Sequence, residues 1–152
     1  LIEYVEAVGN IDDYVKRYDD ATISTAQMEK VAMLDMRLGN MDRNRNNILV
    51  KLDDGGSAHV VPIDHEMIFA NGAQSYNLMS PHWLQFHEEM VVDVNKVFSA
   101  DCVRYLEKLD PDEDIEFLRR CGWEPGNDFV EQFKVFTAFL KIGVSLGITT
   151  YH

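Results

Sequence analysis

Apolar residues recur at helical spacing in the first third of the chain. Val31, Leu34 and Leu38 share one face of a helix. This helix is expected to begin at Thr25, directly after a serine that can cap it, and to end at Leu38. Gly39 follows and suits the left-handed position past a helix C-terminus, because glycine has no β-carbon. The pattern therefore predicts a helix over residues 25–38.

Two short apolar runs follow and flank a glycine-rich turn. The runs are ILVKL at 48–52 and AHVVPI at 58–63, and DDGGS at 53–57 lies between them. Consecutive glycines readily take positive φ, which tight hairpin turns require, so the pattern predicts a β-hairpin. The segment 40–47 before the hairpin consists mainly of Asn, Asp and Arg, and we expect it to be a loop.

The rest of the chain alternates between unpatterned and helical segments. Residues 1–20 show no clear period, and residues 67–86 are expected to form a long irregular loop. Helices are predicted over 101–109 and from Asp110 to Arg120, the second with acids in its first turn and arginines in its last. A final helix carries an apolar stripe made of Phe129, Phe133, Phe136, Leu140 and Val144.

Composition narrows the class of protein. The 152 residues are 46% hydrophobic and 26% charged, which is typical of one globular domain, here residues 1–152 of a mostly helical α+β fold. The net charge of −12 disfavours nucleic acid as a partner, because a phosphate backbone would be repelled. The most apolar stretch, 129–148, contains charged residues, so no transmembrane segment is expected. Two cysteines without a CxxC pair indicate a reducing, cytoplasmic compartment.

Three oxygen-bearing side chains occur in an order that suits phosphoryl transfer. Asp42 and Asn47 lie in the loop before the hairpin, and Asp64 lies at the end of its second strand. Transfer from ATP needs a carboxylate that orients the attacking hydroxyl, together with oxygen ligands for Mg²⁺. Because a tight hairpin returns the chain to its starting point, we expect the two segments to be neighbours.

Four stretches of the sequence resemble one family of kinases. They are LDMRLGNMDRNRNNILV, VPIDHEMIF, LEKLDPDEDIEFLRR and FTAFLKIGVSLGI. The first two resemble the catalytic and metal-binding loops of the phosphatidylinositol 3- and 4-kinase superfamily. The resemblance is strongest to the plant-type phosphatidylinositol 4-kinases that carry ubiquitin-like domains, and it extends over nearly the whole chain. It implies a kinase C-lobe in which the hairpin carries both loops.

The resemblance also implies roles for individual residues. Asp42 would be the catalytic acid-base residue, and Asn47 and Asp64 would be the ligands of Mg²⁺. Leu49 and Ile63 would form the apolar floor under the adenine of ATP. The implied reaction transfers the γ-phosphoryl group of ATP to an inositol hydroxyl.

Two features depart from the family's pattern. Glu66 stands where the metal-binding loop usually has glycine, and a β-carbon there restricts positive φ. No glycine-rich phosphate loop and no strand-borne ATP lysine occur before Thr25. The chain therefore corresponds to a C-lobe alone, whose N-lobe would come from the same protein or from another chain, and the C-lobe by itself is expected to be inactive.

The acceptor of the phosphoryl group is left open by the sequence. Residues 67–80 contain no Lys or Arg, which favours a lightly charged acceptor over a polyphosphorylated lipid. Phosphatidylinositol and a protein hydroxyl both satisfy this condition, and the former would require peripheral contact with a membrane. Three functions thus remain: a phosphatidylinositol 4-kinase, a protein kinase on the same lobe, and a degenerate kinase lobe that acts as an interaction or assembly subunit.

Overall fold

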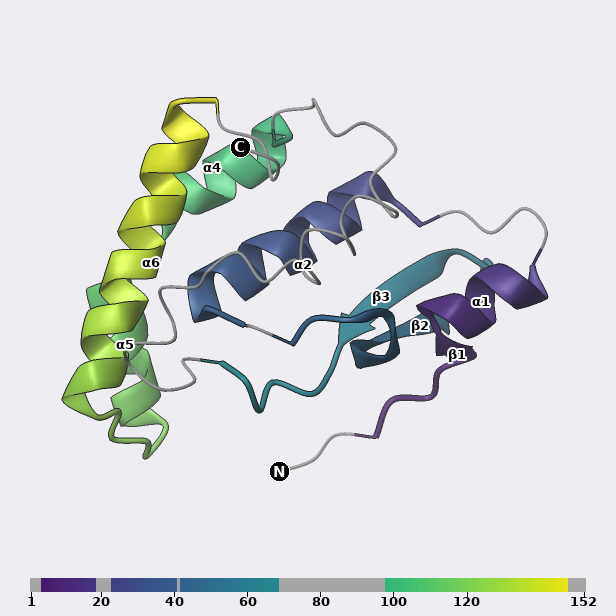
Figure 1. The fold of residues 1–152 in the computed structure, drawn as a ribbon, viewed down its shortest axis with the longest axis horizontal. Coiled ribbons are helices and arrows are strands. Elements are labelled where there is room, and N and C mark those ends of the chain that lie inside the picture. The colour runs from purple at the N-terminus through teal and green to yellow at the C-terminus, as the bar shows by residue number, and fades with distance from the viewer. Residues whose placement is uncertain (1–3, 19–22, 41, 69–97, 148–152) are drawn as a thin grey trace.

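The structure is a computed structural model that describes residues 4–18, 23–40, 42–68 and 98–147. The irregular loop expected over 67–86 lies outside the described residues from position 69 onward. Within the described ranges, helices predominate over a small sheet (Figure 1). The elements are β1 (Gly9–Asn10), α1 (Ile11–Arg17), α2 (Thr25–Leu38), η1 (Arg45–Asn47), β2 (Ile48–Leu52), β3 (Ala58–Pro62), α4 (Ala100–Lys108), α5 (Pro111–Arg120) and α6 (Asn127–Ser145).

These elements confirm the predicted mostly helical α+β fold and its β-hairpin. Helix α2 has the predicted ends, and the start and end of α4 each lie one residue earlier than expected. Helix α5 begins after Asp110, whose carboxylate accepts hydrogen bonds from the backbone N–H groups of Asp112 and Glu113. Ser24 precedes α2 as predicted, but its side chain makes no capping hydrogen bond, whereas Ser99 caps α4 through the Cys102 N–H. Local capping chemistry therefore marks the starts of α4 and α5, and α2 begins at the predicted residue without it.

The N-terminal segment contains two elements that the sequence pattern did not predict. Strand β1 pairs antiparallel with β2, Gly9 opposite Val50 and Asn10 opposite Leu49, so the sheet has the order β1-β2-β3. Helix α1 follows at once, and the Asn10 side chain caps it by accepting a hydrogen bond from the Asp13 N–H at 2.9 Å. A strand of two residues is too short to show a period, which explains why it was missed.

Helix α2 lies between the sheet with α1 on one side and helices α4 and α6 on the other, and it contributes to two hydrophobic cores (Figure 1). On the sheet side, Met28 and Val31 pack with α1 and β2. On the other side, Met33 packs with α4 and α6. The sheet-side core consists of Ile11, Tyr14, Met28, Val31, Ile48 and Val50, and the helix-side core of Met33, Phe98, Cys102, Leu106 and Leu140.

The C-terminal end of α2 is fixed against α5 and α6. Arg37 donates to Thr137 Oγ1 at 3.2 Å, pairs with Asp114 and lies 4.4 Å above the ring of Phe133. Gly39 caps the helix at φ 57°, and a β-carbon there would lie 2.6 Å from the Phe136 ring. Both the dihedral angle and the close approach therefore require glycine at this position.

The apolar stripe predicted for the last helix faces the core in α6. Phe133, Phe136 and Leu140 are buried, and Val144 packs at the edge of the helix-side core. In the described part of the chain, no helix combines the length and the apolar character needed to cross a membrane.

Candidate active site

The loop between α2 and β2 holds Asp42 and Asn47 in direct contact. The Asn47 side-chain amide donates to the Asp42 carbonyl at 2.9 Å and lies 3.4 Å from the Asp42 carboxylate. Asn44 caps η1 through the Asn46 N–H at 3.0 Å and also donates to the Asp42 carbonyl. The backbone of Asp42 is thereby held from within the loop, while its side chain is exposed.

These contacts also fix the orientation of the Asn47 amide. Its NH₂ group donates to Asp42, which leaves its side-chain oxygen as an acceptor. The residue is buried, with 8% of its surface exposed, at the junction of η1 and β2. Asn47 therefore offers an amide oxygen from a largely buried residue, and oxygen is the ligand type that hard cations prefer.

The hairpin brings Asn47 next to the segment that carries Asp64. The Ile63 N–H donates to the Asn47 carbonyl at 2.9 Å, directly beyond the pairing of Ile48 with Pro62. Asp64 is the next residue, and it is exposed. The structure thus joins Asp42, Asn47 and the start of the Asp64 segment through consecutive hydrogen bonds.

The backbone after β3 turns at Asp64. Its φ of 53° lies in the left-handed region, and it is the only non-glycine residue with positive φ in the described ranges. Asp tolerates this conformation better than most residues do. Glu66, which stands where the family usually has glycine, does not have a positive φ. The residue with positive φ is Asp64, two positions earlier, so the β-carbon of Glu66 causes no backbone strain.

A buried ion pair lies beneath both loops. The side chains of Asp35 and Arg43 are 0% exposed. Arg43 donates Nε to one oxygen of Asp35 and Nη2 to the other, both at 2.9 Å. Asn40 donates to the same carboxylate at 3.0 Å, so Asp35 is satisfied by charged and neutral donors together.

The remaining donors of Arg43 reach the hairpin. Nη1 donates to the carbonyls of Asn47 at 2.6 Å and Ile63 at 2.7 Å. Nη2 lies 3.2 Å from Nδ1 of His65, and since a guanidinium can only donate, this ring nitrogen accepts. One side chain therefore contacts α2, the loop before the hairpin and the segment after it.

Sequence reasoning missed Asp35 and Arg43, although one signal was present. Asp35 lies four residues after Val31 and three before Leu38, on the apolar face of the predicted helix. A carboxylate in that position must either reach solvent or find a cationic partner. The identity of that partner could not be read from spacing, because Arg43 lies beyond the helix end.

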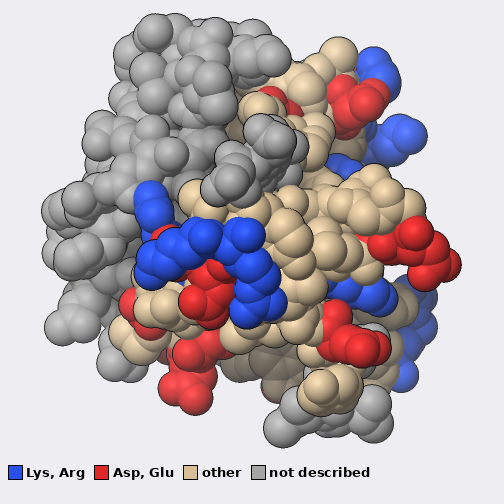
Figure 2. Space-filling model, turned by 90° about the vertical axis from the view of Figure 1, so that its right-hand side faces the viewer, with Lys and Arg blue, Asp and Glu red and all other residues tan. Residues whose placement is uncertain are grey.

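Helix α1 supports the outer side of the same loop. Arg45 pairs with Asp12 at 2.8 Å, and Asn10 donates its side-chain amide to Asn46 at 3.1 Å. Figure 2 faces this side of the molecule and shows basic and acidic side chains lying next to each other there. The unpredicted N-terminal elements are therefore part of what holds the candidate site.

The two apolar residues predicted to contact adenine lie in or next to the hairpin. Leu49 in β2 is paired with Val61 in β3. Ile63 lies two residues after Val61, and side chains two residues apart on an extended chain point to the same side, so all three share one face. Ile48 and Val50 occupy the opposite face, where they enter the sheet-side core. Leu49 and Ile63 are half-buried and thus offer a partly open apolar surface beside Asn47.

Asp64 and Asn47 carry oxygen atoms of the kind that could bind a metal near these loops. No group of three or more His, Cys, Asp or Glu side chains suited to a metal ion occurs in the ranges the structure describes. Asp64 supplies a carboxylate and Asn47 an amide oxygen, a donor pair that fits Mg²⁺, which usually keeps several waters of its own. The residues present therefore fit this cation and do not form an all-protein cage.

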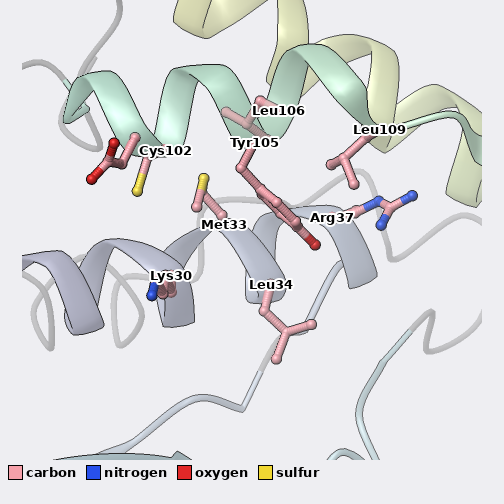
Figure 3. Close-up of a pocket in the computed structure, with 9 residues that line it drawn as sticks. Lys30, Met33, Leu34, Arg37, Cys102, Tyr105, Leu106 and Leu109 are labelled. Atoms are coloured by element: carbon pink, nitrogen blue, oxygen red, sulfur yellow. The ribbon is translucent and has the colours of Figure 1, made fainter.

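A separate groove of about 600 Å³ lies between α2 and α4, away from the loops (Figure 3). Met33 and Tyr105 point into the space between the two helices. Cys102 borders it, and burial raises the pKa of this thiol, which donates to Glu29 at 3.2 Å. Asp42, Asn47 and Asp64 are not part of its lining, so the groove and the candidate site are distinct.

Comparison with known proteins identifies the family. The family described as phosphatidylinositol 3- and 4-kinase matches residues 5–152. Phosphatidylinositol 4-kinase gamma 3 of Arabidopsis thaliana is 32% identical over 149 residues, which are 97% of this chain and 24% of that protein. Phosphatidylinositol 4-kinase gamma 4 of Oryza sativa subsp. japonica is 28% identical over 148 residues, again 97% of this chain and 24% of that protein. The chain thus spans about a quarter of the length of these relatives, and it belongs to the phosphatidylinositol 3- and 4-kinase family.

Proposed function

We propose that this chain is the C-lobe of a phosphatidylinositol 4-kinase type phosphotransferase. In this proposal the γ-phosphoryl group of ATP passes to a hydroxyl of phosphatidylinositol, so that an oxygen–phosphorus bond forms at the inositol and ADP leaves. An N-lobe in the same protein or in another chain would supply the remainder of the nucleotide site. The family to which the chain belongs and the names of its relatives support this reaction class.

The contacts of Asn47 carry the proposal. Its side chain donates to Asp42, and its carbonyl accepts from Ile63, the residue before Asp64. One residue thus links the proposed acid-base residue to the proposed metal-binding segment. Phosphoryl transfer depends mainly on such positioning, because the protein has little covalent chemistry to perform.

Each residue has a distinct role in the proposed reaction. Asp42 orients the acceptor hydroxyl and accepts its proton, a role that requires the exposed carboxylate found at this position. Asn47 and Asp64 hold Mg²⁺ through their side-chain oxygens. A bound Mg²⁺ neutralises charge on the phosphates during transfer. Leu49 and Ile63 provide the apolar surface against which the adenine lies.

The proposed acceptor determines where the reaction occurs. Phosphatidylinositol is embedded in a bilayer, so the protein would make peripheral contact with a membrane on its cytoplasmic side, where ATP is available. The absence of Lys and Arg from residues 67–80 supports an acceptor without extra phosphate groups.

A nucleotide-binding measurement tests the first step. Mg-ATP is expected to raise the melting temperature of the chain joined to its N-lobe, because a ligand that binds only the folded state stabilises it. Asp64→Ala should abolish this increase. Asp54→Ala is the matched control, since Asp54 is also an exposed carboxylate and lies in the hairpin turn, and this variant should keep the increase. If Mg-ATP leaves the melting temperature of the unsubstituted protein unchanged, the proposal is refuted.

A phosphate-transfer assay then identifies the acceptor. Labelled ATP is supplied with phosphatidylinositol vesicles in one arm and with protein acceptors in the other. Label in the lipid, lost in Asp42→Asn, is the expected result. Label only in protein would replace the lipid acceptor with a protein hydroxyl, and no transfer in either arm would favour a degenerate lobe.

A further inference from the structure

The buried pair of Asp35 and Arg43 has no role in the reaction proposed above. Both side chains are completely buried. Removing two charges from water costs several kcal/mol per ion, and apolar residues of similar size often replace such pairs without loss of stability. The pair is therefore poorly explained as a stabilising device, and its contacts point to another purpose.

The geometry of Arg43 explains why an arginine occupies this position. Its donors reach acceptors in three separate segments: Asp35 in α2, the Asn47 carbonyl before β2, and the Ile63 carbonyl after β3. A guanidinium carries five N–H groups in a rigid plane, whereas an ammonium concentrates three donors at one nitrogen. Only the planar group can span all of these acceptors at once.

We propose that Arg43 is a positioning residue that holds the Asp64 segment against the loop of Asn47. This inference rests on the proposed function in so far as Asn47 and Asp64 bind the metal. The Asn47 carbonyl accepts from both Arg43 and the Ile63 N–H, so the arginine reinforces the only backbone contact described between these two segments. Arg43 also contacts the side chain of His65, so it contacts the residue after Asp64 as well. Asp35 bonds Arg43 to α2 and so fixes the direction in which the guanidinium group of Arg43 points.

Arg43→Lys separates positioning from charge neutralisation. Lysine keeps the positive charge that Asp35 requires, but it cannot reach both carbonyls and the carboxylate together. If Arg43 serves only to neutralise Asp35, lysine will restore the behaviour of the wild type. If Arg43 positions the two segments, the lysine variant will remain folded and lose alignment of the metal ligands.

The experiment measures Mn²⁺ binding to the full chain by electron paramagnetic resonance. Binding is measured at one temperature for all variants, and urea denaturation at that temperature first establishes that each variant is folded in the absence of urea. Arg43→Lys should bind Mn²⁺ about tenfold to a hundredfold more weakly, the usual effect of losing a residue that orients metal ligands. Leu140→Ala is the control, because it removes apolar packing on the opposite side of α2, and it should bind Mn²⁺ as the wild type does.

Amide hydrogen exchange provides a second readout that does not depend on the metal. In Arg43→Lys, exchange at the Ile63 N–H should accelerate relative to Val50 and Val60 in the same hairpin. Equal acceleration at all three positions would show a general loss of stability and would overturn the proposal.

The two readouts distinguish failure of this inference from failure of the proposed function. Equal Mn²⁺ affinity in wild type and Arg43→Lys overturns the positioning role and leaves the proposed function intact. A wild-type chain that binds no Mn²⁺ contradicts the proposed metal site, and hydrogen exchange at Ile63 then decides the positioning role by itself.

Discussion

The two sides of α2 differ in how deeply their polar contacts are buried, since the pair of Arg37 and Asp114 on the helix side is partly exposed and the pair of Asp35 and Arg43 is not. On the helix side, apolar side chains such as Met33, Leu106 and Leu140 fill the space between α2, α4 and α6. On the sheet side, an apolar core is joined by a buried charged network around Asp35 and Arg43. Both sides therefore contribute stability through apolar cores, and the sheet side adds a fully buried charged network that contacts the loops of the candidate site.

The polar contacts of the sheet side are directional, and this is the property that a site requires. Apolar packing tolerates small shifts, since it has no preferred angle. A guanidinium bonded to a carboxylate and two carbonyls fixes both distance and orientation. The loops of the candidate site therefore lie where directional, buried contacts are made.

The largest expected effect comes from breaking the charged network. Asp35→Ala should lower the free energy of unfolding by about 3–5 kcal/mol, because it leaves the buried Arg43 charge without a partner. Urea denaturation measures the change. Glu116→Ala, which removes an exposed ion pair with Arg119, is the control and should cost at most about 1 kcal/mol. Similar costs for the two variants would contradict the burial of the pair.

Removal of packing on the helix side should be nearly as destabilising but should spare the site. Leu140→Ala is expected to cost about 2–5 kcal/mol, since the shortened side chain leaves a cavity among α2, α4 and α6. Urea denaturation gives the free energy of unfolding, and NMR shows which amide resonances shift. The resonances of Asn47 and Ile63 should stay in place, and large shifts there would mean that the two sides of α2 are coupled.

A smaller effect is expected from the polar contact between α2 and the edge of the sheet. Gln27 donates to the Ala58 carbonyl at 2.9 Å and accepts from the Val60 N–H at 2.7 Å, as a neighbouring strand would. Gln27→Ala should cost about 1–3 kcal/mol, because both backbone groups are left partly buried without this partner. Hydrogen exchange at Val60 should accelerate most, and unchanged exchange there would contradict the contact.

The smallest effect is expected in the exposed hairpin turn. The pKa of Asp53 lies below its ordinary value, first because His59 bonds to its carboxylate and next because the Ser57 N–H does. A lowered pKa means that the contribution to stability is present above the ordinary value of 3.8 and is lost as the pH falls through the lowered pKa. NMR titration of the Asp53 carboxyl should show this, and His59→Ala should raise the midpoint. A midpoint that is the same in both proteins would rule out His59 as the main cause.

The relation between sequence and structure also differs between regions. The end of α2 at Gly39, the start of α5 after Asp110 and the hairpin were predictable, because capping residues and glycines act within a few positions of the chain. Strand β1 exists only through its pairing with β2, and no local signal marks it. The order of Asp42, Asn47 and Asp64 was visible in the sequence, and the hairpin explains why Asn47 and the Asp64 segment meet.

Other features of the site could be found only in three dimensions. The burial of Arg43 depends on α2, the loop and the end of β3 surrounding it, and Arg43 lies 8 residues after Asp35 and 20 before Ile63. The positive φ at Asp64 was likewise invisible, since Asp adopts several backbone conformations and the sequence pointed instead to Glu66.

The sequence by itself determined which segments become helices or a hairpin and in what order the oxygen-bearing residues occur, because these depend on short-range periodicity, capping and turn chemistry. Only the tertiary structure decided that Asp35 and Arg43 form a buried link between the two loops. Such a link arises from the meeting of surfaces that are distant in the chain, and its energy depends on the exclusion of water that their packing creates.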